Sequence, residues 1–215
     1  VIPAAGVGSR MQLSLPKQYA YLAGQTVIEH ACAPLLALPE VVSCVVAISA
    51  ADTFFQTLPL AKHPKIKVGI GGEQRAHSVL NGLQALQDLA QADDWVLVHD
   101  AARACLTQSD LRKLIEEVGD DSVGGLLASP VRDTPKSGRD GRVVQTVDRS
   151  VLWQAQTPQL FRYGLLCRAL TQALAVGVNV TDEASAVEWA GYQPKLVQGR
   201  ADNLKITTPE DLALA

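Results

Sequence analysis

The chain has few cysteines, and none of them stands in a metal-binding or redox pattern. The four cysteines include no C-x-x-C pair, and neither they nor the four histidines show the spacing of metal ligands. A zinc enzyme or a cysteine-nucleophile enzyme is therefore not expected. Cys32, Cys44 and Cys167 lie in apolar stretches, as buried thiols do, and this usage favours a reducing cytoplasm.

Long apolar runs and an excess of basic residues are also missing. No run approaches the roughly 18 apolar residues that a membrane span needs, and 19 Lys and Arg against 22 Asp and Glu leave a net charge of −3. We therefore expect no membrane and no nucleic-acid polymer as a partner. With 215 residues, 47% of them hydrophobic, the chain is long enough to bury a large core, and one domain over residues 1–215 is predicted.

Two common phosphate-binding motifs are absent from a segment that is nevertheless rich in glycine. A Walker A loop needs a Gly-Lys pair, which occurs nowhere, and the dinucleotide fingerprint needs a third glycine after Gly6 and Gly8. The segment VIPAAGVGSRMQLSLPK, residues 1–17, instead has the order A-A-G-x-G-x-R-M with a later P-K that is typical of nucleotidyltransferases. Its glycine turn, Arg10 and Lys17 can surround a polyphosphate. An ordinary glycine turn with two solvated cations is the alternative.

Apolar runs of strand length alternate with helical patterns along most of the chain. Strands are predicted over 41–49, 66–70, 95–101 and 123–131, and helices over 26–38, from Gly72 to about residue 90, after Thr107, over 163–176 and over 181–190. Residues 195–197 and 203–206 look extended, and Pro209 after Thr208 predicts a terminal helix. This alternation predicts an α/β fold with a doubly wound, mostly parallel, Rossmann-like sheet, which binds ligands at the carboxyl ends of its strands.

Residues 132–149 interrupt this alternation. A turn-forming run over 137–141 is followed by a β-rich stretch over 143–147, which together predict a protruding β-hairpin arm. Because an isolated hairpin is marginally stable, we expect the arm to pack on a partner chain and the protein to form a homodimer.

Eight segments, in order along the chain, resemble the 2-C-methyl-D-erythritol 4-phosphate cytidylyltransferase family. They are PAAGVGSRM with PKQY, GGEQRAHSV, VLVHDAAR, PVRDTPK, TVDR, QTPQ, TDEAS and GRADNLKIT. The resemblance implies a fold of the nucleotidyltransferase type and transfer of a cytidylyl group from CTP to 2-C-methyl-D-erythritol 4-phosphate (MEP). The products would be 4-diphosphocytidyl-2-C-methyl-D-erythritol, an intermediate of non-mevalonate isoprenoid biosynthesis, and pyrophosphate. One departure is Ala104, where the family usually has proline.

The same resemblance implies roles for individual residues. Arg10, Lys17, Arg149 and Lys205 would be catalytic, and Mg²⁺ would arrive with the triphosphate, with ligands that the resemblance leaves unknown. CTP would contact Pro3, Ala4, Ala5, Gly6, Gly8, Arg10, Lys17, Gly72, Glu73, Arg75, Ser78, Asp100 and Ala101. MEP would contact Asp100, Arg103, Thr134, Arg149, Thr157 and Lys205.

Several of these residues have simpler interpretations. Ser78 can be a plain helix residue, Asp100 a helix cap, and Lys205 an edge lysine whose stem covers apolar surface. Thr181 followed by Asp182 and Glu183 is typical of an ordinary helix start, where carboxylates are favoured. Two other functions stay open, a ribitol-5-phosphate cytidylyltransferase and a non-catalytic nucleotide-binding regulator.

Overall fold

A computed structural model describes residues 1–6 and 15–215 of the chain. Its main sheet consists of two groups of strands that meet at Val1. In one group β4 (Cys44–Ile48) pairs in parallel with both β1 (Ile2–Ala4) and β5 (Ile66–Ile70). The other has the order β11 (Lys195–Gln198), β7 (Gly124–Pro130), β10 (Trp153–Arg162), β6 (Trp95–Val98). The backbone nitrogen of Val1 donates to Leu97 (2.7 Å), and His99 donates back to Val1 (3.0 Å), so β1 joins β6.

The sheet is mostly parallel, as the sequence predicts, and β10 is its antiparallel strand. β10 pairs with β6 on one side and with β7 on the other, and both pairings are antiparallel. No strand was predicted over residues 153–162, because the polar side chains in this stretch hide the apolar pattern of a strand. Gln156, Thr157 and Gln159 are all buried there. Their burial comes from the neighbouring strands, which a local pattern does not reveal.

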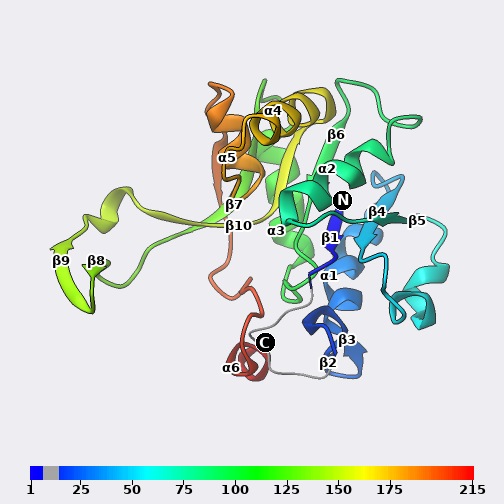
Figure 1. Ribbon diagram of the computed structural model, residues 1–215, viewed down its shortest axis with the longest axis horizontal. Helices are drawn as coiled ribbons and strands as arrows, with labels where there is room; N and C mark the ends of the chain where they lie inside the picture. Colours follow the sequence, from blue (N-terminus) through cyan, green and yellow to red (C-terminus); the bar gives the residue numbers. More distant parts are fainter. Residues whose placement is uncertain (7–14) are drawn as a thin grey trace.

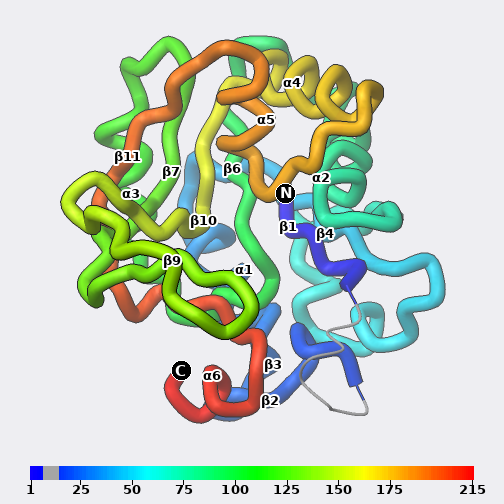
Figure 2. The backbone as a smooth tube through the Cα atoms, turned by 60° about the vertical axis from the view of Figure 1, so that its left-hand side comes forward, coloured from blue at the N-terminus to red at the C-terminus, as the bar shows by residue number. Residues whose placement is uncertain are grey.

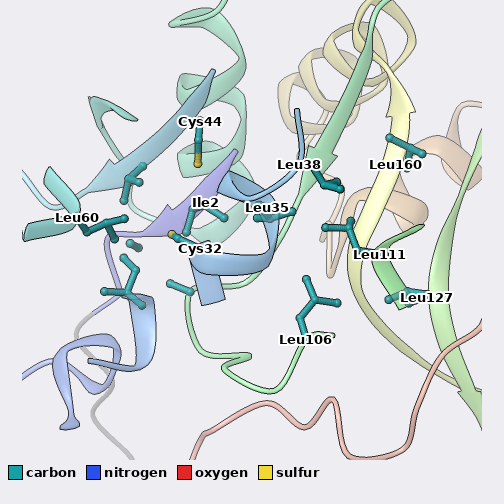
Figure 3. Close-up of a cluster of buried hydrophobic side chains, with 14 of the residues drawn as sticks. Ile2, Cys32, Leu35, Leu38, Cys44, Leu60, Leu106, Leu111, Leu127 and Leu160 are labelled. Carbon is teal, nitrogen blue, oxygen red and sulfur yellow. The ribbon is translucent and has the colours of Figure 1, made fainter. Parts of the chain in front are cut away.

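Helices cover both faces of the sheet (Figures 1 and 2), which confirms the doubly wound arrangement. One apolar cluster joins α1 (Val27–Leu36) and α3 (Gln108–Val118) to the face of Ile2, Val46 and Leu127, and Figure 3 shows part of it. A second cluster joins α2 (Arg75–Gln84), α4 (Tyr163–Ala175) and α5 (Glu183–Trp189) to the face of Val45 and Leu126. Successive residues of β4 and β7 thus point to opposite faces.

The capping residues explain where two of these helices begin. Thr26 and Glu29 form the predicted capping box of α1, and the backbone N–H of Thr26 donates to Glu29 Oε2 at 2.8 Å. Thr107 caps α3 by accepting from the backbone of Asp110. No helix in the described part of the chain is long and apolar enough to cross a membrane.

The C-terminal segment returns to the beginning of the chain. A small hairpin, β2 (Tyr21–Leu22) and β3 (Gln25–Thr26), lies beside α6 (Pro209–Leu214) in both views. Ile206 is fully buried in a small cluster with Ala20 and Val27. Residues 203–206 were expected to be extended, and in the structure they form a loop that pairs with no strand among the described residues. Packing of this loop brings Lys205 close to Lys17.

The predicted arm is a hairpin of β8 (Lys136–Arg139) and β9 (Arg142–Thr146) that extends away from the sheet in Figure 1. Its turn uses Asp140 and Gly141 at positive φ (51° and 73°), a conformation typical of tight hairpins. Val143 and Val144 are each 65% exposed. The arm therefore presents two large apolar side chains to solvent.

Candidate active site

A cavity of about 410 Å³ lies where β1 and β6 end, at the carboxyl edge of the parallel strands. It gathers segments that are far apart in the sequence, namely the end of β1, the glycine pair before α2, the loop after β6 and the C-terminal loop. Its walls are formed by Pro3, Ala4, Ala5, Gly6, Lys17, Gln18, Gly72, Glu73, Gln74, Arg75, Ser78, Asp100, Ala101, Ala102, Lys205 and Thr207.

Most residues that the sequence assigns to CTP line this cavity. They are Pro3, Ala4, Ala5, Gly6, Lys17, Gly72, Glu73, Arg75, Ser78, Asp100 and Ala101, and Lys205 joins them. Gly8 and Arg10 lie outside the described residues. Gln18, Gln74, Ala102 and Thr207 line the cavity without having been predicted. The adjacency of Gln18 to Lys17 in the PKQY segment was the available signal for it.

Gln18 hydrogen-bonds to the residues that lead into the glycine-rich segment. Its side chain is 3% exposed, and its Nε2 donates to the carbonyl oxygens of Ala4 (2.8 Å) and Gly6 (3.2 Å). One amide therefore fixes two carbonyl groups of the segment that enters the cavity. Beside it, Lys17 Nζ donates to the carbonyl oxygen of Ile206 at 2.9 Å, which ties the beginning of the chain to the C-terminal loop.

The glycine pair before α2 is needed for close packing. A Cβ on Gly71 would stand 2.5 Å from Cβ of Ala5, and one on Gly72 would stand 2.5 Å from Cβ of His77. Ser78 closes this turn, since its Oγ accepts from the backbone N–H of Gly72 at 3.0 Å. Ser78 thus helps to shape the cavity wall.

Asp100 lies at the centre of the charged groups. Its Oδ1 is 2.8 Å from Arg75 Nε, its Oδ2 is 2.8 Å from Lys205 Nζ, and Arg103 Nε is 3.8 Å away. Burial alone would raise the pKa of Asp100, but the charges of Arg75 and Lys205 hold it well below its usual range. Asp100 therefore stays ionised. It is not a helix cap, because the next helix, α3, begins after Thr107.

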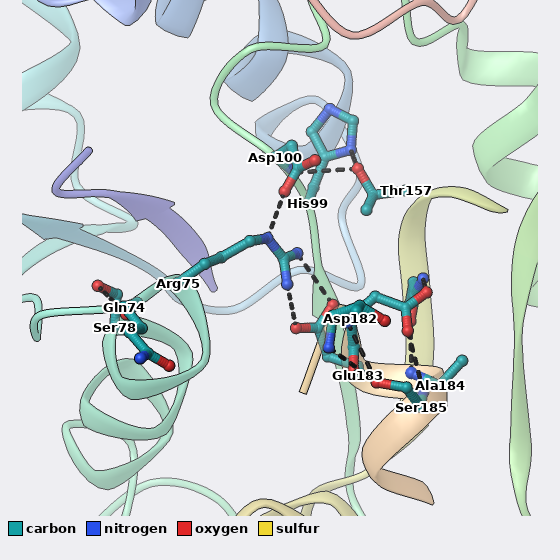
Figure 4. A network of polar contacts seen from close by, with 12 residues as sticks. Gln74, Arg75, Ser78, His99, Asp100, Thr157, Asp182, Glu183, Ala184 and Ser185 are labelled. Carbon is teal, nitrogen blue, oxygen red and sulfur yellow. Dashed lines mark hydrogen bonds and ion pairs between the residues drawn. The ribbon is translucent and has the colours of Figure 1, made fainter. Parts of the chain in front are cut away.

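Arg75 connects Asp100 to a carboxylate that the sequence did not assign to the site. Its Nη1 and Nη2 lie 2.7 and 3.0 Å from the two carboxylate oxygens of Glu183. Figure 4 shows Arg75 between Asp100 and Glu183. The cap of α5 is Asp182 instead of Thr181, and Glu183 is the first residue of that helix. The pattern of an ordinary helix start concealed this ion pair.

Thr157 and His99 support Asp100 from outside the cavity lining. The backbone N–H of Asp100 donates to Thr157 Oγ1 (3.0 Å), which lies 3.0 Å from His99 Nδ1 (Figure 4). Nε2 of His99 faces the carbonyl oxygen of Arg103 (3.2 Å), so Nε2 carries the proton and Nδ1 accepts from the hydroxyl of Thr157. Burial lowers the pKa of His99 to about 4 and keeps the ring neutral.

The other residues assigned to MEP do not line the cavity of this chain. Arg103 is buried, and its guanidinium donates to the carbonyl oxygens of Asn203 and Ala155, which anchors the loop that carries Lys205. Thr134 precedes β8 and Arg149 follows β9, so both belong to the arm. Arg149 donates to the carbonyl oxygen of Arg132. Thr157 is likewise buried behind Asp100.

The described residues offer no group of three or more carboxylates, histidines or cysteines that could hold a metal ion. Mg²⁺ commonly binds through one or two carboxylates together with phosphate oxygens of a nucleotide. Asp100 and Glu73 line the cavity, and an ionised carboxylate can accept at several positions. These residues fit a Mg²⁺ that a triphosphate carries.

A mostly parallel, doubly wound sheet with a glycine-rich segment and two lysines at its carboxyl edge defines an α/β nucleotidyltransferase. Comparison with known proteins then gives the family. The chain belongs to the 2-C-methyl-D-erythritol 4-phosphate cytidylyltransferase family, whose profile matches residues 1–215.

Individual relatives agree with this assignment. The chain is 61% identical over 214 residues to the 2-C-methyl-D-erythritol 4-phosphate cytidylyltransferase of Pseudomonas aeruginosa, covering 99% of this chain and 92% of the relative. It is 55% identical over 217 residues to the enzyme of the same name from Cronobacter sakazakii, covering 100% of this chain and 90% of the relative. A crystal structure of the Francisella tularensis enzyme superimposes with a TM-score of 0.84 at 38% identity, covering 99% and 94% of the two chains.

Proposed function

We propose that this cavity transfers the cytidylyl group of CTP to MEP, with 4-diphosphocytidyl-2-C-methyl-D-erythritol and pyrophosphate as products. The observation that carries the proposal is the meeting of Lys17 and Lys205 beside Asp100 at the end of the glycine-rich segment. Both lysines belong to segments that resemble this family, and whole-chain membership of the family supports the same activity.

The proposed reaction requires alignment of MEP with CTP and stabilisation of charge at the α-phosphate, and it requires no general base. The second pKa of a phosphate monoester is about 6, so the attacking oxygen of MEP is already largely anionic at neutral pH. It attacks the α-phosphorus of CTP, a P–O bond forms, and the bond to the pyrophosphate leaving group breaks. Two anions must be held together while charge develops at the α-phosphate. Lys17, and Arg10 beyond the described residues, stabilise that charge.

Lys205 binds the phosphate of the second substrate, MEP. Its Nζ is held at 2.8 Å by Asp100 while its side chain keeps 39% of its surface exposed, so it remains available to an incoming phosphate. Asp100 and Lys205 therefore orient MEP, and Arg103 and Thr157 hold the loop and the strand end that carry them. Asp100 and Glu73 would hold a Mg²⁺ that arrives with CTP, and the ion would supply additional positive charge for the leaving group.

The hairpin arm contributes to a neighbouring site in a two-fold homodimer. Thr134 and Arg149, which the family resemblance assigns to MEP, lie on the arm and do not line the cavity of their own chain. The arm exposes Val143 and Val144, and covering them requires another surface. A reciprocal arrangement in which each arm completes its neighbour's site explains both observations.

The cytoplasm is the proposed location. All four cysteines are free thiols, with Cys32 and Cys44 buried, which fits a reducing compartment.

Product identification tests the proposed reaction. The purified protein is incubated with MEP, MgCl₂ and each of the four nucleoside triphosphates, and the products are identified by mass. We expect release of pyrophosphate and a cytidine diphosphate ester with CTP, and poor turnover with UTP and ATP. Equal turnover with ATP contradicts the cytidylyl assignment. An assay with ribitol 5-phosphate in place of MEP tests the alternative function, a ribitol-5-phosphate cytidylyltransferase. The names of the relatives do not favour that alternative.

A further inference from the structure

A buried carboxylate outside the cavity lining, Glu183, is part of a continuous chain of charged groups that ends at Lys205. Glu183 is 0% exposed, and an unpaired charge in that position would be strongly destabilising. Both of its carboxylate oxygens are taken by Arg75, at 2.7 and 3.0 Å. The carboxylate of Glu183 is therefore committed to one partner, Arg75.

The start of α5 fixes Glu183 in place. Asp182 accepts from the backbone of Ser185 in a capping box, and Gln159 of β10 donates to Asp182 (2.9 Å) and accepts from the backbone of Ala184 (2.8 Å). Figure 4 shows Arg75 extended between this helix start and Asp100. Hydrogen bonds to β10 thus hold the helix start that carries Glu183.

The pairing with Glu183 decides how Arg75 meets Asp100. Because both Nη atoms face Glu183, Arg75 reaches Asp100 through Nε, at Oδ1. The other oxygen, Oδ2, is left for Lys205 at 2.8 Å. A guanidinium without Glu183 would favour the bidentate fork on Asp100. It would then compete with Lys205 for that carboxylate.

We propose that Glu183 is a positioning residue for the transfer reaction, which acts through Arg75 and Asp100 to hold Lys205 at the phosphate of MEP. The inference rests on the proposed function, in which Lys205 meets that phosphate. Glu183 touches no substrate. A merely structural ion pair between α2 and α5 would stabilise the fold without any coupling to Lys205.

A double-mutant cycle separates these two roles. Glu183→Gln, Lys205→Ala and the double variant are compared through kcat/KM for MEP at saturating CTP, with enzyme in excess where turnover is slow. We expect Glu183→Gln to lower kcat/KM at least tenfold in the wild-type background and less than twofold in the Lys205→Ala background. Equal losses in the two backgrounds overturn the proposal.

Matched variants keep the test decisive. Glu188→Gln makes the same chemical change at an exposed residue of α5 and should leave the rate unchanged. Glu183→Asp keeps the charge but shortens the side chain, so it replaces Glu183→Gln in the cycle if that variant does not fold. The loss of kcat/KM that Glu183→Asp causes must then also disappear in the Lys205→Ala background. If the wild-type chain forms no cytidine diphosphate ester from MEP, the proposed function fails. If it does and the losses are equal, the inference on Glu183 alone fails.

Discussion

Lys17 donates a hydrogen bond of 2.9 Å to the carbonyl oxygen of Ile206, the residue that follows Lys205. The bond spans 189 positions of sequence, and it ties Lys17 to the loop that carries Lys205, so that both lysines of the proposed reaction line one cavity. Asp100 is the carboxylate that pairs with Lys205, and its low pKa keeps it ionised while substrates bind. Several consequences of this arrangement can be measured.

Lys17→Ala should lower kcat by about 10² to 10³ and leave KM for CTP nearly unchanged, because Lys17 is proposed to meet charge that develops in the transition state. Steady-state rates with CTP and MEP measure both constants. Lys67→Ala removes an exposed lysine of β5 and serves as the control. A normal kcat with a raised KM would make Lys17 a ground-state clamp on the triphosphate.

Gln18→Glu should weaken CTP binding by about tenfold or more. The substitution replaces the amide donor with a carboxylate that faces the carbonyl oxygens of Ala4 and Gly6, so the glycine-rich segment loses its support. Calorimetric titration with CTP measures the effect. Gln84→Glu, at an exposed position of α2, is the matched control. Unchanged CTP affinity in Gln18→Glu would mean that the segment holds its shape without this amide.

Acidification should destabilise the wild-type protein partly through His99. The pKa of this buried ring is lowered from the usual 6.5 to about 4, so the unfolded chain takes up its proton first as the pH falls. The contribution of His99 to stability is complete above pH 6.5 and is lost as the pH drops toward 4. It amounts to about 2 kcal/mol between pH 7 and 4.5.

Urea unfolding of wild type and His99→Gln at these two pH values tests that contribution. The amide of Gln can donate to the carbonyl of Arg103 and accept from Thr157, but it does not titrate. The free energy of unfolding of the variant should therefore fall less on acidification. An identical fall in both proteins would show that His99 does not carry this pH dependence.

Arg149→Ala and Lys205→Ala, each nearly inactive alone, should complement each other when co-expressed. If the arm acts on the neighbouring chain, each mixed dimer has one site with both residues intact. Random mixing makes about half of the dimers mixed, so about a quarter of the wild-type activity should return. No recovery in proven mixed dimers would show that Arg149 serves its own chain.

Lys17→Ala mixed with Lys205→Ala provides the control for this experiment. Both residues line the cavity of one chain, so each site in their mixed dimers lacks one lysine and no activity should return. Recovery in this control would indicate exchange or reactivation unrelated to the arm.

Local features of the fold follow from the sequence alone. The capping box of Thr26 with Glu29, strand β5 over residues 66–70 and the hairpin arm were all predicted, because each depends on residues a few positions apart. The glycine-rich segment and the family motifs also indicated most of the cavity lining. These features carry enough information to identify the fold class and the family.

The contacts that join distant segments were decided by the tertiary structure. Arg75 and Glu183 are 108 positions apart, and Arg103 and Asn203 are 100 apart. Strand β10 is polar in sequence and is buried because β6 and β7 flank it. The motif around Glu183 is typical of an ordinary helix start. Such a motif does not indicate which distant side chain, here Arg75, contacts the carboxylate. The sequence thus determined the local elements and indicated most of the residues that line the cavity. The order of the strands decided which charges pair, because ion pairing depends on distance in space rather than on distance along the chain.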